Sequence, residues 1–507
     1  MSHLLENRLI IFVFSLTLLT LSCLGPEGIP IKTYIISSRF DELYLIFSES
    51  ESYFRSPNST FRLILFFLSF LLMYITLITP AANSLKISNL MLKTINFIIF
   101  FFFLFNLTTN NGSNIAFLLI LAISFFYLLF IRNPENINKY SKIEVLLLLA
   151  MLIMFFISIL SAVHHDSNLR EIDVYTRFFL LIPIYLLLRD IKIDYKILFI
   201  VINATAIIAG LFALYQYFII GEYRVMGHTS SATIYGNVSL TLMVLSYLTI
   251  PFFRKPKYLL ALPLIAMLFA FIAWSLTGSR GSLLGLLFLL LILFSKKYRD
   301  LLYLPNFKVS ILFVILFGVI LIQSNNINRI VEGYNSGYNY IVNEDKRLNW
   351  RNPDSFLPRL FIWQGSYNII KENFYSGVGL DKFNDNLLKE IEEKRIPMIK
   401  NDYDNPTAGL NHAHNQYLDI LAKTGIGGLT ALIFFLIVNM VFFHQGVCSK
   451  LKEVQQLSVF GMATIIMYSS YMLTHAVLSH HHSTLFMLMN LILFSSLVTN
   501  LKNKGTK

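Results

Sequence analysis

Long apolar runs separated by short polar segments dominate this chain. Most of the runs are continuously apolar over about 17 to 25 residues, the length that spans a bilayer as a helix, and they do not alternate as barrel strands would. We therefore predict an all-α polytopic membrane protein with about 12–14 transmembrane helices. Residues 9–22 also match the apolar core of a cleaved secretory signal, and we interpret them as the first span. Fourteen candidate spans lie near residues 7–24, 61–80, 92–108, 115–132, 143–163, 174–189, 196–220, 234–253, 257–276, 281–296, 307–324, 424–444, 456–477 and 483–499.

The composition excludes a soluble globular protein. The 507 residues are 55% hydrophobic and only 14% charged, and the mean hydropathy is +0.62. The formal charge of +12 requires no nucleic-acid partner, because basic residues of polytopic proteins mark the cytoplasmic loops. Cys23 and Cys448 are too far apart for a short metal-binding motif, and the topology puts them on opposite sides of the membrane, so we expect no disulfide.

Lysines and arginines of the short loops give the orientation, because they concentrate on the cytoplasmic side. With both termini in the cytoplasm, 21 of the 41 basic residues lie in inner segments and eight in short outer ones. The other twelve lie in the segment 325–423, which is too long to follow the rule. The chemistry is expected at the outer face, which receives most of the histidines and several arginines: His164, His165, Arg170, Arg177, Arg224, His228, Arg280, Arg359, His412, His414, His475 and His480 to His482.

The spans divide the chain into four regions. Residues 1–140 form an N-terminal transmembrane region, and residues 141–324 form a transmembrane core whose outer loops carry Arg224 and Arg280. Residues 325–423, including "GYNSGYNYIVNEDKRLNWRNPDSFLPRL", are rich in charge, Asn and Tyr and contain no span. We expect this large outer loop to fold as a partly helical cap on the membrane. Residues 424–507 supply three C-terminal transmembrane helices.

One helix of the cap is predicted in "PRLFIWQGSYNIIKENF". Asp354 or Ser355 would cap it, and Pro358 suits its first turn. Arg359 would then project from a helix N-terminus, where free N–H groups and the dipole favour anions such as phosphate. The alternative is a solvated arginine that pairs with a nearby acid. Apolar residues recur at roughly helical spacing at Phe361, Ile362, Tyr367, Ile369 and Ile370.

Two further arginines occupy short outer loops. Arg280 stands in "WSLTGSRGSLLGLL", between two apolar runs, where small residues leave the backbone accessible. Arg224 stands in "GEYRVMGHTSSATIYGN". Each arginine is a candidate for binding an anion, and each is equally compatible with anchoring to lipid headgroups.

Polar residues at the edge of a predicted span draw attention to "NHAHNQYLDILAKTGIGG", residues 411–428. Asn411 or Asn415 is expected to cap a short helix that ends at Gly425 and Gly428. A histidine at this N-terminus feels the positive end of the helix dipole, which keeps the imidazole neutral and able to accept a proton from a hydroxyl.

Other interpretations of these histidines remain open. His412 and His414 suit helix capping, an interfacial position or a metal pair, although no cysteine or carboxylate stands at ligand spacing. "SHHHS" at 479–483 is a second candidate metal site, but three successive side chains of one helix cannot all face one ion.

Taken together, these motifs resemble the O-antigen ligase family of bacterial inner-membrane glycosyltransferases. The family signature has His, then Asn, Ser or Gln, nine residues, Gly, two residues and Gly, which matches His414, Asn415, Gly425 and Gly428 in register. "RLFIWQGSYNIIKENFYSGVGLDKF" resembles the family's Arg-Trp segment with its Gly-x-Gly, and "SRGSLLGL" resembles the motif of its other arginine. The resemblance covers about residues 205–440. Family ligases are shorter, with about twelve spans, so two N-terminal spans are extra or two of the predicted spans are re-entrant.

The resemblance implies a GT-C-like fold and a site on the periplasmic side of the bacterial inner membrane. The donor would be an O-antigen glycan on undecaprenyl diphosphate, and the acceptor a sugar hydroxyl of the lipid A core. His414 would deprotonate the acceptor, and Arg280 and Arg359 would bind the diphosphate without a metal ion or other cofactor. Asn415 would orient the histidine, and Arg224 would touch glycan or phosphate. Both substrates are anchored in membrane lipid, so the cleft would open to the bilayer.

Three other functions are compatible with the sequence. An O-antigen polymerase would use the same donor with a second lipid-linked glycan as acceptor, and a protein O-oligosaccharyltransferase would use a protein; the His-Asn spacing is closer to the ligase signature. A lipid or polysaccharide transporter would also have many spans, but it should carry ionisable residues in mid-membrane or matching broken helices in two halves. The sequence shows neither feature.

Overall fold

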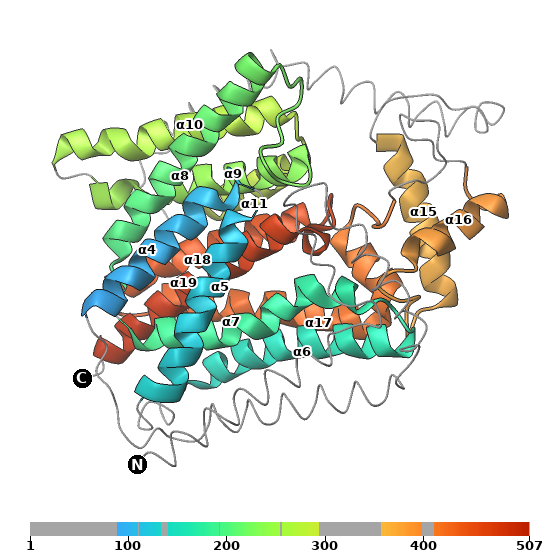
Figure 1. The fold of residues 1–507 in the computed structure, drawn as a ribbon, viewed down its shortest axis with the longest axis horizontal. Helices are drawn as coiled ribbons and strands as arrows, with labels where there is room; N and C mark the ends of the chain where they lie inside the picture. Colours follow the sequence, from blue (N-terminus) through green and yellow to red (C-terminus); the bar gives the residue numbers. More distant parts are fainter. Residues whose placement is uncertain are drawn as a thin grey trace, which may run out of the picture.

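A computed structural model describes residues 89–109, 111–132, 140–191, 193–253, 256–293, 356–397 and 410–505 (Figure 1). The expected spans near 7–24, 61–80 and 307–324 lie outside these residues. The described residues form helices and no β-strand. Seven of the described helices are long and apolar enough to cross a membrane, so the prediction of an all-α polytopic membrane protein is confirmed.

Each of the other eleven expected spans coincides with a helix of the described part of the chain. These helices are α4 (Asn89–Asn106), α5 (Gly112–Phe126), α6 (Lys142–His164), α7 (Asp173–Asp190), α8 (Tyr195–Tyr215), α9 (Ala232–Thr249), α10 (Ala261–Thr277), α11 (Leu283–Leu293), α17 (Gln416–Val447), α18 (Lys452–Tyr471) and α19 (His481–Gly505). Short π- or 3₁₀-helical segments extend or join them: η2 (Tyr127–Ile131), η4 (Leu169–Ile172), η5 (Gln216–Ile220), η6 (Ile250–Phe253), η7 (Lys257–Leu260) and η9 (Val477–Ser479).

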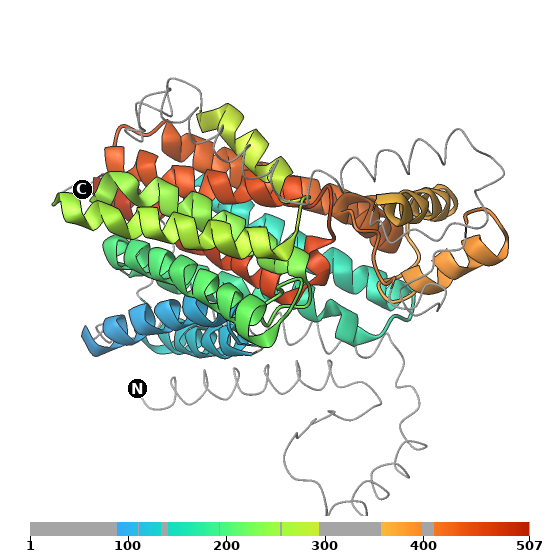
Figure 2. The same cartoon turned by 90° about the horizontal axis from the view of Figure 1, so that it is seen from above.

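The long helices run side by side in one bundle (Figures 1 and 2). Helix α10 packs on α8 and α9, α17 packs between α6 and α18, and α19 packs between α7 and α18. Helices α9 and α19 are buried on nearly all sides, whereas α6 and α10 expose apolar side chains such as Leu160 and Leu268. Such exposure is expected of helices at the rim of a bundle in lipid.

Two contacts join loops that the charge pattern assigns to the same side of the membrane. At one end of the bundle, the His228 N–H donates to the Leu107 carbonyl. At the other end, the Tyr195 hydroxyl donates to Glu453 at 3.1 Å. Loops assigned to one side of the membrane therefore contact one another, as an alternating topology requires.

The cap forms a small lobe beyond one end of the bundle, at the right of both views (Figures 1 and 2). It contains α15 (Phe356–Glu372) and α16 (Phe383–Glu392). Helix α15 is the one predicted from the apolar spacing, but Tyr367 is 63% exposed, so its assignment to the apolar face was wrong. Asp354 and Ser355 lie outside the described residues. The lobe has a hydrophobic core of its own, formed by Phe361, Ile362, Ile369, Ile370, Val378, Phe383, Leu387, Ile396, Ala413 and Ala422.

A break in α17 joins the cap to the bundle. The expected stop at Gly425 is present as a single non-helical residue, with φ 67° and ψ −167°. A Cβ there would lie 2.1 Å from the Tyr375 carbonyl oxygen, so only glycine allows the cap backbone to approach this closely. The Val378 N–H donates to the Ala422 carbonyl just before the break. The expected stop at Gly428 was wrong, because α17 continues through it to Val447.

Candidate active site

Asn415, and not Asn411, caps α17. Its side-chain oxygen accepts hydrogen bonds from the N–H groups of Tyr417 at 3.0 Å and Leu418 at 3.2 Å, which satisfies two free donors of the first turn. The side-chain NH₂ donates to the Leu473 carbonyl at 3.1 Å. Asn415 therefore ties the histidine segment to the connection between α18 and α19.

His414 has an unusual backbone conformation for a residue with a side chain. Its φ is 49°, in the left-handed region that costs free energy outside glycine. The residue before it is held from two directions. The Ala413 N–H donates to Asp419 at 3.0 Å, and the Trp363 indole N–H of α15 donates to the Ala413 carbonyl at 3.0 Å. These contacts to the bundle and the cap fix the position of His414.

Four histidine rings form one cluster, which we call the histidine cluster: His412, His414, His475 and His480. The ring centroids of His412 and His414 are 4.4 Å apart, and those of His475 and His480 are stacked at 4.7 Å. The two pairs are in contact, with 5.4 Å between the centroids of His412 and His480. The sequence singled out the first pair; the structure adds the second from a segment about sixty residues later.

Burial keeps the whole cluster neutral. It lowers the pKa of His412 and of His414 to about 3, with neighbouring histidines and Arg359 acting in the same direction. It also lowers the pKa of His480 to about 4 and that of His475 well below its usual value. The neutral imidazole expected from the helix dipole is therefore present, with burial as its largest cause.

Several nitrogens of the cluster are buried without a hydrogen-bond partner among the residues that the structure describes. They are Nδ1 of His412, Nδ1 of His414, both ring nitrogens of His475 and Nε2 of His480. Buried polar atoms are rarely left in this state. Among the described residues, no group of three or more His, Cys, Asp or Glu side chains is arranged to hold a metal ion. Of the "SHHHS" histidines only His480 joins the cluster, while His481 Nδ1 contacts Arg177 at 2.7 Å.

The three arginines singled out by the sequence lie together beside this cluster. Arg359 stands in the first turn of α15 and is partly buried. Its pKa is lowered by burial and then by the positive charges of Arg224 and Arg280. Arg224 Nε donates to the Thr277 carbonyl at 2.8 Å, which holds the α8–α9 loop against the α10–α11 turn. Arg359 in turn lowers the pKa of His414, so the fold brings all five candidate residues to one end.

A buried network below the histidine segment was not foreseen. Asp419 is 1% exposed, and it pairs with Lys423 at 3.1 Å. The Gln416 side chain accepts the Leu478 N–H at 2.6 Å. The first turns of α17 thus hold both histidine-bearing segments. The available signal was the Asp-x-x-x-Lys spacing in the otherwise apolar "QYLDILAK".

Comparison with known proteins finds a family model that matches part of the chain. Residues 265–435 match the family model described as O-antigen ligase. These residues, about a third of the chain, are similar to the O-antigen ligase family. An uncharacterised protein of Haemophilus influenzae is similar to it, with 26% identity over 396 residues that cover 78% of this chain and 95% of the relative.

The part that matches the O-antigen ligase model contains most of the candidate site. Arg280, Arg359, His414 and Asn415 lie within it, whereas Arg224 lies before it. His475 and His480 also lie outside the matched segment. The similarity points to a glycosyltransferase-like enzyme family, whose substrates are lipid-linked glycans in a membrane.

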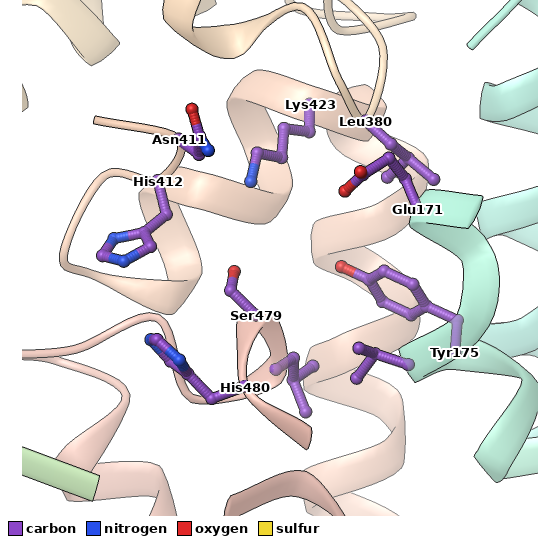
Figure 3. A pocket seen from close by; sticks show the side chains of 10 residues that line it. Glu171, Tyr175, Leu380, Asn411, His412, Lys423, Ser479 and His480 are labelled. Carbon is purple, nitrogen blue, oxygen red and sulfur yellow. The ribbon is translucent and has the colours of Figure 1, made fainter. Parts of the chain in front are cut away.

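A cavity of 310 Å³ adjoins the histidine cluster on the side of α7 (Figure 3). His412 and His480 lie on one side of it, and Glu171 and Tyr175 lie on the other. The complete lining is Glu171, Val174, Tyr175, Leu380, Asn411, His412, Lys423, Leu478, Ser479 and His480.

The arrangement suits the chemistry of this enzyme family. Neutral imidazoles with unpartnered nitrogens can accept a proton from a hydroxyl. Clustered guanidinium groups keep their charge and bind phosphate oxygens in pairs, so an anion carrying several charges offsets their mutual repulsion. A proton acceptor beside an anion site is what glycosyl transfer from a diphosphate requires.

Proposed function

We propose that this protein is an O-antigen ligase, which transfers an O-antigen polysaccharide from undecaprenyl diphosphate to a sugar hydroxyl of the lipid A core. The observation that carries the proposal is that the neutral ring of His414 lies near the charged side chain of Arg359. Arg359 in turn lies near Arg224 and Arg280. The family description as O-antigen ligase supports the choice of reaction.

The proposed reaction is one displacement at the anomeric carbon of the donor glycan. The acceptor oxygen forms a bond to this carbon as the bond from the carbon to the diphosphate oxygen breaks. His414 takes the proton of the acceptor hydroxyl, and the electron pair of the broken bond leaves on undecaprenyl diphosphate. Because burial disfavours imidazolium, His414 is in the proton-accepting form at every physiological pH.

The arginines act on the leaving group. Arg359 and Arg280 would bind the diphosphate oxygens and offset the charge that develops as the bond breaks. Arg224 would contact the same phosphates or the first sugar, and Asn415 positions His414 through the caps and loop contacts described above. Because guanidinium groups can offset this charge without a divalent ion, we expect full activity in EDTA.

The placement in the cell follows from the charge pattern and the proposed substrates. We propose that the histidine end of the bundle faces the periplasm and that both termini lie in the cytoplasm, within a bacterial inner membrane. A donor anchored in the outer leaflet would then reach the arginines from the bilayer.

The test is the lipopolysaccharide of a strain that lacks this gene. If the protein is the ligase, long glycan chains remain on undecaprenyl diphosphate and the lipid A core carries none, and the wild-type gene restores the ladder. A lipid A core that still carries single repeat units would instead identify a polymerase. An unchanged ladder would contradict both functions.

A further inference from the structure

The 310 Å³ cavity adjoins the histidine cluster at His412 and His480. Its lining includes His412 and His480 but none of Arg224, Arg280 or Arg359. The cavity is therefore lined by other residues than the three arginines of the proposed anion site.

The lining combines apolar and hydrogen-bonding groups in the way of a binding site for a small polar molecule. Val174, Leu380 and Leu478 are buried apolar residues, and the buried ring of Tyr175 points into the space (Figure 3). Asn411 and Ser479 add side-chain groups that both donate and accept hydrogen bonds. An apolar wall facing hydroxyl and amide groups suits a sugar, which has apolar ring faces and a rim of hydroxyls.

The charges of the lining favour an uncharged occupant. Lys423 is already paired with Asp419 at 3.1 Å, and the flanking histidines are neutral. Glu171 is exposed, and its carboxylate makes no hydrogen bond or ion pair with the other described residues. The cavity therefore presents one uncompensated carboxylate, which accepts hydroxyl hydrogen bonds and repels a phosphate.

From this geometry we infer that the cavity binds an uncharged, hydroxyl-rich sugar unit of the acceptor, with Glu171 as a specificity-determining residue that disfavours a phosphorylated unit. The inference rests on the proposed transfer to a saccharide. It places the acceptor in the cavity and the donor diphosphate at the arginines, so that an acceptor hydroxyl meets the anomeric carbon beside His414.

The test uses the full-length protein in lipid nanodiscs with a polyprenyl-diphosphate-linked glycan as donor. Two acceptors are compared, a neutral lipid-linked oligosaccharide and the same oligosaccharide with a phosphate on the terminal unit. We expect the wild type to prefer the neutral acceptor in kcat/KM. Glu171→Gln should lower this preference about tenfold, the effect of one charge on a hydrogen-bonded contact. Glu392→Gln, which changes an exposed carboxylate on α16, is the matched control and should keep the preference.

A second variant tests the space of the cavity independently of the charge of Glu171. Asn411→Trp places a large side chain at the cavity without removing a side-chain hydrogen bond to any described residue, and should raise the KM for the neutral acceptor at least about tenfold with the donor KM unchanged. A wild type that transfers the glycan, combined with unchanged preference in Glu171→Gln and unchanged KM in Asn411→Trp, overturns the cavity assignment alone. A wild type that transfers to no saccharide overturns the proposed function and the assignment with it.

Discussion

The two ends of the helix bundle both bury titratable side chains, but among the described residues the buried histidines of one end have fewer partners than the buried charged groups of the other. At the cytoplasmic end of the predicted topology, which we call the charge-paired end, buried arginines meet carboxylates and phenols. At the histidine end, buried imidazoles face one another. We infer from this contrast that the paired side chains stabilise the fold, whereas the histidines are available to bind a substrate.

The charge-paired end satisfies its charges inside the protein. Arg189 Nε donates to Glu144 at 2.7 Å, with both side chains less than 5% exposed. Tyr185 donates to the same carboxylate at 3.0 Å. Asp190 accepts from Arg189 at 3.2 Å and from Arg132 at 3.3 Å. Buried ion pairs add little net stability when intact, but removing one partner is costly.

The histidine end leaves hydrogen-bonding capacity unused. Unpartnered buried nitrogens occur on His412, His414, His475 and His480, and each such group costs about 1–3 kcal/mol. The left-handed backbone of His414 adds strain. These free-energy costs are typical of functional sites, where a bound substrate can supply the missing hydrogen bonds. For this reason we place function at this end.

The largest expected effect is a loss of glycan transfer, without loss of stability, on substitution of a histidine. His414→Ala should lower the rate of glycan transfer by about 100- to 10,000-fold, because the acceptor proton loses its base. Thermal unfolding should change little, since the His414 ring makes no hydrogen bond with the other described residues and the backbone strain persists. His164→Ala, which removes an exposed histidine at the same end, is the control. Near-normal transfer by His414→Ala, at normal expression, would rule out the assigned role.

The opposite result is expected at the charge-paired end. Glu144→Ala leaves Arg189 and Tyr185 without the carboxylate that both contact, and should destabilise the protein by about 3–5 kcal/mol. Transfer per folded molecule should remain near the wild-type rate. Thermal unfolding in detergent and an activity assay normalised to folded protein measure the two quantities. A catalytic defect without loss of stability would mean that this end also takes part in the reaction.

A smaller effect, on the kinetics of the donor, tests the role of the arginines. Arg359→Lys keeps the positive charge but loses the planar fork that binds two phosphate oxygens, so we expect kcat/KM for the donor to fall about tenfold. Arg395→Lys on the cap is the matched control, because Arg395 pairs with Glu372, Glu390 and Glu393 away from the site. Equal donor kinetics in both variants would show that Arg359 contributes only charge.

Features set by neighbouring residues could be predicted from the sequence. Apolar runs located the helices because each span must satisfy its own backbone in lipid. The apolar spacing of "PRLFIWQGSYNIIKENF" located α15 and put Arg359 in its first turn. The residue types Asn415 and Gly425 gave the cap and the break of α17, since both depend on local backbone geometry.

Features that depend on packing between distant segments could not be predicted. Nothing in the spacing brings His475 and His480 to His412, because that contact depends on how the α18–α19 connection folds back over α17. The exposure of Tyr367 depends on which side of α15 the cap core covers. The same holds for the cavity, whose lining comes from four separate parts of the chain.

The last prediction concerns the pH dependence of stability at the histidine end. In the unfolded chain a histidine binds a proton near pH 6.5, whereas in the folded protein the pKa of His412 is about 3. Between these values the unfolded state binds more protons, so stability falls as the pH falls from about 6.5, by up to about 1.4 kcal/mol per pH unit for each such histidine, and is constant above it.

His412→Asn should therefore reduce the acid-induced loss of stability between pH 6.5 and pH 4, by about 1.4 kcal/mol per pH unit, while His228→Asn, at an exposed position outside the cluster, should follow the wild type. Thermal unfolding across this pH range measures the difference. Parallel curves of stability against pH for the three proteins would mean that His412 reaches water in the folded state. His412 would then not belong to the buried, unpartnered groups that distinguish the histidine end.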